Sequence, residues 1–261
     1  MSAQMKLSAN LGFLFRELPL PDAIHAAARA GFGAVECHWP YDVDPAAIRA
    51  ALSETGLPML SLNTAVGDSA KGDLGLAAVP GREAEARRLI DQAIDYAVVV
   101  GARNVHVMAG RAEGPAARAA FVSNLRYADA RISARQINIL VEPLNHRDGA
   151  GYFLRRLEDA VALIDSVGIA RLKVMFDCYH LQIEGGDLLR RFQQYAAYVG
   201  HIQFAGVPDR GEPDVGEVAY EWLLPSLVEA GYAGWIGAEY RPRGGTLAGL
   251  GWMRQLPRQG L

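Results

Sequence analysis

The chain has 261 residues, of which 51% are hydrophobic and 21% charged, a composition typical of a globular protein with a sizeable core. Its formal net charge is −3 and its Lys and Arg residues are dispersed, which argues against a nucleic-acid-binding protein. Two cysteines, no apolar run of membrane-spanning length and no apolar signal-peptide core near the start predict a cytoplasmic protein without a membrane segment.

Short apolar runs alternate with helical patterns almost to the end of the sequence. The expected strands are 6–11, 34–37, 59–63, 104–108, 137–142, 172–177, 200–204 and 235–239. The expected helices lie between them, at 22–30, 45–55, 82–100, 116–134, 157–167, 187–197 and 220–230. Eight such repeats without a composition break predict an α/β fold, a single (β/α)8 TIM barrel formed by residues 1–261. An open doubly wound sheet is the alternative, but no glycine-rich phosphate-binding sequence follows the first strand.

Each of the last four expected strands carries an acidic or amide residue at or near its end: Glu142, Asp177, Gln203 and Glu239. The carboxyl ends of barrel strands meet at one face, where the active sites of this fold lie. Three carboxylates and one amide oxygen form the all-oxygen ligand set that Mg²⁺ or Mn²⁺ prefers, so we predict a divalent metal site there. The alternative is that each residue is a solvated strand end or the N-cap of the next helix.

A metal held beside spare carboxylates suggests proton transfer next to a carbonyl group. One glutamate would remove a proton from carbon, and another would return a proton to the neighbouring carbon. Glu142 and Glu239, which follow the fifth and eighth strands, are the expected catalytic pair.

Four basic residues near this face are candidates for substrate binding: His180, His201, Arg210 and Lys71. His180 follows the sixth strand closely enough to reach substrate oxygens. Arg210, in the loop after the seventh strand, and Lys71, in the long loop 64–81, would each pair with a substrate carboxylate. The alternatives are a structural role for His180, a supporting role behind Gln203 for His201, and a surface ion pair of Arg210 with Asp209, Glu212 or Asp214.

The strings "VEPLN", "FDCYHLQ", "GHIQFAGVPDRGEPDVGE" and "GWIGAEYRPRGGT" are similar to motifs of a known family. Over nearly its whole length the chain resembles the hydroxypyruvate isomerase family of the xylose-isomerase-like TIM barrels. The resemblance implies an isomerase of a small hydroxylated oxo acid, with Glu142 and Glu239 as the acid–base pair. It also implies the metal ligands Glu142, Asp177, Gln203 and Glu239, with Gln203 where many relatives have His.

Two subfamilies compete within this resemblance. The expected reaction is hydroxypyruvate to tartronate semialdehyde, and the alternative is a 2-oxo-tetronate isomerase. "VEPLNH" looks more like the first subfamily, whereas "NTAVGD" and "AGVPDRGEPD" look more like the second. A sugar epimerase is less favoured, because such enzymes carry Glu where this chain has Asp148. An abasic-site endonuclease is disfavoured because its His-rich zinc cluster and basic groove are missing. The expected partner is a small oxo acid, and the oligomeric state is left open, a homo-oligomer included.

Overall fold

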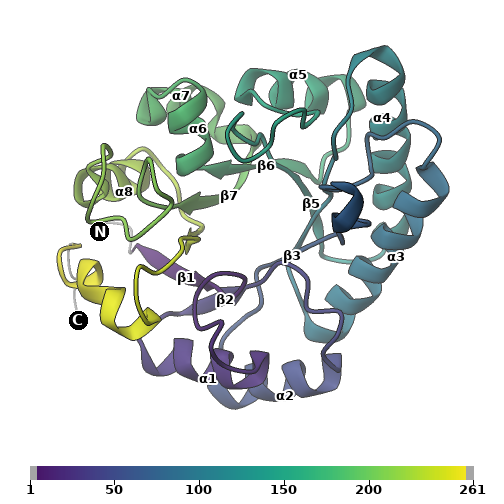
Figure 1. Ribbon diagram of the computed structural model, residues 1–261. Coiled ribbons are helices and arrows are strands. Elements are labelled where there is room, and N and C mark those ends of the chain that lie inside the picture. The colour runs from purple at the N-terminus through teal and green to yellow at the C-terminus, as the bar shows by residue number, and fades with distance from the viewer. Residues whose placement is uncertain (1–4, 257–261) are drawn as a thin grey trace.

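The computed structural model of the chain describes residues 5–256. Eight parallel strands surround a common axis, and helices cover them from outside (Figure 1). The sheet order is β2-β1-β8-β7-β6-β5-β4-β3, and a parallel bridge from Val35 to Met59 joins the two end strands. These strands form the predicted (β/α)8 TIM barrel: β1 (Lys6–Asn10), β2 (Ala34–Glu36), β3 (Ser61–Asn63), β4 (Asn104–His106), β5 (Asn138–Val141), β6 (Leu172–Asp177), β7 (Val199–Phe204) and β8 (Trp235–Ala238).

The helices lie close to the predicted ranges. They are α1 (Leu20–Arg29), α2 (Pro45–Thr55), α3 (Glu83–Val100), α4 (Gly114–Arg131), α5 (Leu157–Val167), α6 (Cys178–Glu184), α7 (Leu188–Tyr195) and α8 (Tyr220–Glu229). Three 3₁₀ helices complete the set: η1 (Ser69–Lys71), η2 (Ala196–Tyr198) and η3 (Thr246–Arg254). The short helix α6 and the C-terminal η3 were not predicted, because α6 has seven residues and η3 is a 3₁₀ helix, which does not follow the apolar period of an α-helix. Within residues 5–256, no helix has the length and apolar character needed to cross a membrane.

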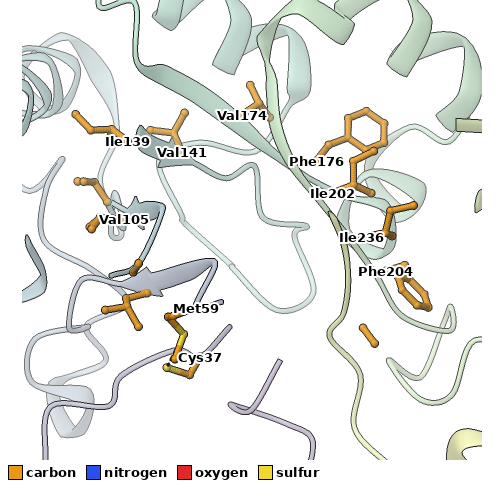
Figure 2. Packing of buried hydrophobic residues seen from close by; sticks show 14 of the residues in the cluster. Cys37, Met59, Val105, Ile139, Val141, Val174, Phe176, Ile202, Phe204 and Ile236 are labelled. Atoms are coloured by element: carbon orange, nitrogen blue, oxygen red, sulfur yellow. Dashed lines mark hydrogen bonds between the residues drawn. The ribbon is translucent and has the colours of Figure 1, made fainter. Parts of the chain in front are cut away.

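Successive strand residues point alternately into the barrel and toward the helices, as the two-residue period of a strand requires. On β7, Ile202 and Phe204 belong to the apolar layer between strands and helices, together with Val174 and Phe176 of β6 (Figure 2). The residues between them on each strand point inward. Polar residues at the ends of the strands therefore face the barrel axis, while the apolar layer outside holds the helices in place.

The long loop after β3 is connected to the loops beside it. Gly75 pairs with Ala109 in an antiparallel bridge, which joins this loop to the loop after β4. Arg111 donates a hydrogen bond to the carbonyl oxygen of Gly72 and another, of 2.9 Å, to the carbonyl oxygen of Ala150. The guanidinium of Arg111 therefore links the third loop to the fifth.

Candidate active site

The buried acidic residues at the ends of the last strands converge on the mouth of the barrel. Glu142 and Glu239 follow β5 and β8 directly, and Asp177 pairs in register with Gln203. The Nε2 atom of His180 lies 3.8 Å from Glu142 Oε1 and 3.6 Å from Asp177 Oδ2. One candidate ligand atom from each of these three residues lies within 4.8 Å of the other two. The structure thus brings Glu142, Asp177 and His180 into one cluster.

Arg210 joins this cluster from the loop after β7. Its Nη2 lies 2.7 Å from Glu239 Oε2 and 3.5 Å from Asp177 Oδ2, and its Nη1 lies 3.5 Å from Asp148 Oδ2. The side chain is buried between the aromatic rings of Phe13 and Tyr179. The alternative of an ion pair within its own loop is therefore wrong, because the described partners of Arg210 come from three other parts of the barrel.

Glu239 accepts hydrogen bonds on both of its oxygens. Its Oε1 accepts from Asn10 Nδ2 at 2.9 Å and lies 2.7 Å from His38 Nε2, while Arg210 donates to Oε2. Burial alone would raise the pKa of this carboxyl group. The charge of Arg210 and the hydrogen bond from His38 outweigh burial and hold the pKa of Glu239 well below its usual range. Glu239 is thus a stable anion.

The pKa values of Glu142 and Asp177 are raised, in contrast to that of Glu239. Burial, followed by the charges of Glu239 and Asp177, raises the pKa of Glu142 well above its usual range. Burial, followed by the charge of Glu239, raises the pKa of Asp177 to about 8 although Arg210 acts against this rise. When all three carboxyl groups are ionised, they and one guanidinium leave two formal negative charges in a buried space. A divalent cation would balance those charges.

Asp177 caps a helix with one carboxylate oxygen and faces the cluster with the other. Its Oδ1 accepts a 2.8 Å hydrogen bond from the backbone N–H of Tyr179 and thereby caps helix α6. Its Oδ2 is buried without a hydrogen-bond partner. Capping therefore fixes the carboxylate so that the second oxygen points into the cluster.

The hydrogen bonds of His180 determine which ring nitrogen carries the proton. The backbone N–H of Asn145 donates to Nδ1 over 3.1 Å, and the side-chain nitrogen of Asn145 lies 2.8 Å from the same atom. A nitrogen that accepts from a backbone N–H cannot carry a proton itself, so the neutral ring carries its proton on Nε2. Burial, and then the charge of Arg210, lowers the pKa of His180, which keeps the ring neutral. His180 consequently presents an Nε2–H group toward the carboxylates of the cluster.

Three buried oxygens without hydrogen-bond partners show whether the site could hold a metal ion. Buried oxygens without a hydrogen-bond partner occur on Glu142 (Oε1), Asp177 (Oδ2) and Gln203 (Oε1). Such atoms are costly to bury unless another group binds them. An all-oxygen set with excess negative charge suits a hard divalent cation. The residues present fit the predicted cation, and the buried acidic cluster is consistent with a metal site of the kind found in this type of barrel.

Two of the predicted substrate-binding residues lie outside this cluster. Lys71 is exposed in η1, and its ammonium group pairs with Asp68 at 3.0 Å. His201 is buried behind the cluster, where its Nε2 lies 2.9 Å from Glu36 Oε2. This position agrees with the alternative given by the sequence, in which His201 supports Gln203 from behind. Substrate binding by Lys71 and His201 stays a prediction.

Sequence reasoning did not identify several residues that line the site: Asn10, Glu36, His38 and His106. The Nδ1 atom of His106 lies 3.6 Å from Glu142 Oε2, and neither ring nitrogen has a hydrogen-bond partner among residues 5–256. Burial lowers the pKa of His106 to about 4, so the ring is neutral. Asn10, Glu36 and His106 are the last residues of β1, β2 and β4. The signal that identified Asp177, a polar residue at a strand end, would have found them too.

Comparison with known proteins agrees with this geometry. The family described as "Xylose isomerase-like TIM barrel" matches residues 24–256. A 2-oxo-tetronate isomerase of Cupriavidus necator is 47% identical over 95% of this chain and 97% of its own length. The hydroxypyruvate isomerase of Escherichia coli K12 is 38% identical over 95% of this chain and 98% of its own length.

A solved structure is similar to this chain in both sequence and fold. A protein from Brucella melitensis, described as an AP endonuclease of family 2, is 41% identical and superposes with a TM-score of 0.92. The match covers 96% of this chain and 98% of that one. A match to the family over residues 24–256 and relatives that align over nearly the full length lead to one conclusion. The chain belongs to the hydroxypyruvate isomerase and 2-oxo-tetronate isomerase family, an enzyme family of the xylose isomerase-like TIM barrels.

Proposed function

We propose that this enzyme moves the carbonyl group of a short hydroxylated 2-oxo acid to the neighbouring carbon, with 2-oxo-tetronate as its preferred substrate. The observation that carries this proposal is the buried group of unbonded carboxylate oxygens beside Arg210. The carboxylates supply acid–base groups, and the guanidinium supplies a partner for a substrate carboxylate. The preference is supported by the relative of that name at 47% identity, against 43% for a putative hydroxypyruvate isomerase of Mus musculus.

Hydroxypyruvate is the second candidate. It was the expected substrate from the sequence, and the string "VEPLNH" favours it. Its reaction, to tartronate semialdehyde, needs the same groups as the reaction of 2-oxo-tetronate. The two substrates differ by one hydroxylated carbon, so a single site could turn over both at different rates.

The residues proposed to hold the cation are Glu142, Asp177, Gln203 and Glu239. The first three present unbonded oxygens, while Glu239 would have to exchange one of its present hydrogen bonds. When bound, Mg²⁺ or Mn²⁺ would polarise the substrate carbonyl and the adjacent hydroxyl group.

The chain's own residues then account for the proton movements. Glu239, which Arg210 and His38 keep ionised, takes the proton from the carbon that bears the hydroxyl group, and Glu142, whose pKa burial raises, delivers a proton to the former carbonyl carbon. The hydroxyl proton passes to the former carbonyl oxygen, with the Nε2–H of His180 as the donor that holds this oxygen. Transfer of the proton from Glu239 to Glu142, the group with the higher pKa, restores both groups for the next turnover.

Arg210 is proposed to bind the substrate carboxylate. Its Nε–H is buried and has no hydrogen-bond partner, so the guanidinium has a donor to spare. Arginine is suited to this task because its planar donors match the two oxygens of a carboxylate. The rings of Phe13 and Tyr179 hold the guanidinium in place.

Endonuclease activity, which the name of the Brucella melitensis protein suggests, is not proposed. Among residues 5–256, the acidic cluster contributes a single histidine to the group of possible ligands, and that histidine presents a protonated nitrogen. A zinc cluster of an endonuclease would need several histidines. The net charge of −3 also provides no basic surface for a nucleic acid.

The test is an assay of the purified protein with 2-oxo-tetronate and hydroxypyruvate side by side, each with EDTA and after readdition of Mg²⁺ or Mn²⁺. We expect turnover of both acids, a higher kcat/KM for 2-oxo-tetronate, loss of activity in EDTA and recovery with either metal. Inactivity toward both acids in the presence of metal would contradict the proposed reaction, and unchanged activity in EDTA would contradict the role of the cation.

A further inference from the structure

A buried glutamate outside the predicted ligand set connects two sides of the barrel. Glu36 is the last residue of β2, and its side chain is 1% exposed. Its Oε1 accepts a 3.0 Å hydrogen bond from Ser8, and its Oε2 accepts from Gln203 Nε2 at 2.9 Å. His201 Nε2 also lies 2.9 Å from Oε2. Glu36 thus faces three hydrogen-bonding groups and none of the proposed metal-binding oxygens.

The bond between Glu36 and Gln203 crosses the barrel interior. Their strands, β2 and β7, are separated in the sheet by β1 and β8. Gly237 of β8 lies beside the path: a Cβ atom there would be 1.9 Å from Glu36 Oε1 and 3.1 Å from Gln203 Cγ. The glycine therefore leaves the space through which the carboxylate of Glu36 reaches Gln203.

This bond fixes the orientation of the Gln203 amide. An ionised carboxylate only accepts hydrogen bonds, so the amide must turn its NH₂ group toward Glu36. The amide oxygen then points the other way, where it is buried without a partner. Rotation of the amide by half a turn would place the amide oxygen against a carboxylate and the NH₂ group toward the cation site. Both contacts of the rotated amide would be repulsive.

We propose that Glu36 is a positioning residue that holds the amide oxygen of Gln203 toward the metal site, an inference that rests on the cation of the proposed function. Supporting residues of this kind commonly change metal affinity about 10–100-fold when they are replaced. Glu36 itself makes no contact with the reacting groups in this arrangement, so its effect must pass through Gln203.

The test measures Mn²⁺ affinity by titration with electron paramagnetic resonance, in the wild type and in Glu36→Asp and Glu36→Gln. Glu36→Asp keeps the charge but shortens the side chain, so that it no longer reaches Gln203. Glu36→Gln loses the charge but keeps an acceptor oxygen at the same distance. If orientation matters, we expect Glu36→Asp to weaken Mn²⁺ binding about tenfold or more and Glu36→Gln to weaken it less. The reverse order would overturn the proposal, because it would show that Glu36 acts through its charge.

A double-mutant comparison identifies the route of the effect. In a Gln203→Ala background there is no amide to orient, so the difference between Glu36→Asp and Glu36→Gln should disappear. A difference of the same size in that background would overturn the proposal. Absence of Mn²⁺ binding in the wild type would instead contradict the proposed function itself, so the two failures are distinguishable.

Two further variants control for structural damage. Glu212→Asp makes the same change at another buried glutamate, which pairs with Arg243, and should leave Mn²⁺ affinity within about threefold of the wild type. An equal loss in Glu212→Asp and Glu36→Asp would overturn the proposal. Gly237→Ala retains Glu36 and Gln203 but fills the space between them, so it should also weaken Mn²⁺ binding. Unchanged binding in a folded Gly237→Ala protein would count against the proposal, whether or not Glu36→Asp folds.

Discussion

Glu142→Gln is expected to lower kcat by about 10²–10⁴-fold, the usual contribution of a positioned acid–base group. The substitution preserves the shape of the side chain but removes the group that would deliver a proton to the former carbonyl carbon. It also removes one carboxyl group from a crowded anionic cluster, in which burial and the neighbouring charges raise its pKa. We therefore expect the variant to unfold at a temperature no lower than the wild type. Steady-state kinetics with 2-oxo-tetronate, together with a thermal unfolding curve, would check both expectations.

The matched control for this variant is Glu229→Gln, which makes the same chemical change at an exposed position at the end of α8. This control should have the activity and stability of the wild type. Full activity in Glu142→Gln would remove Glu142 from the mechanism. A strong loss of stability would indicate a structural role that the unbonded Oε1 atom does not suggest.

Arg210→Ala is expected to have the second large effect, on both substrate affinity and stability. Truncation leaves Glu239 and Asp177 buried without their cation, a loss that typically costs about 3–5 kcal/mol of unfolding free energy. If Arg210 binds the substrate carboxylate equally in the ground and transition states, KM should rise by about tenfold or more while kcat changes less. Kinetics at saturating metal and urea unfolding would measure the two effects separately.

Arg243→Ala provides the comparison for Arg210→Ala. Arg243 pairs with Glu212 at 3.2 Å, but its side chain is 46% exposed. Because water reaches the Arg243 side of this pair, we expect the variant to lose less stability than Arg210→Ala and to keep the KM of the wild type. A KM for Arg210→Ala that equals the wild-type value would limit Arg210 to holding the carboxylates in place.

The sequence predicted the barrel because its strands and helices differ in period and repeat eight times. It also identified the acidic residues near the mouth, because Asp177 and Glu239 stand at the ends of apolar strands whose direction the fold determines. The helix bounds that agreed best, those of α2 and α5, belong to segments with clear start and stop signals. In α2, Pro45 begins the helix and Gly56 follows its last residue in a left-handed conformation.

The contacts between the loops could not be predicted in the same way. Arg210 and Glu239 are 29 residues apart, and nothing in either local sequence indicates that they meet. The partner of Glu36 is 167 residues away, on a strand that is not adjacent in the sheet. The tautomer of His180 depends on the backbone of Asn145, which belongs to the loop after β5. These interactions form only when distant segments come together in the closed barrel. Local sequence patterns predict the strands and helices but not which side chains of distant loops meet.

The guanidinium of Arg111 affects how the loops around the barrel mouth can move. Because it binds carbonyl groups in the third and fifth loops, and a bridge joins the third loop to the fourth, these three segments cannot open one at a time. A movement that breaks these contacts belongs to the nanosecond-to-microsecond range of loop motion, slower than the rotation of a single side chain. Opening of the mouth on that side would then depend on the side chain of one arginine.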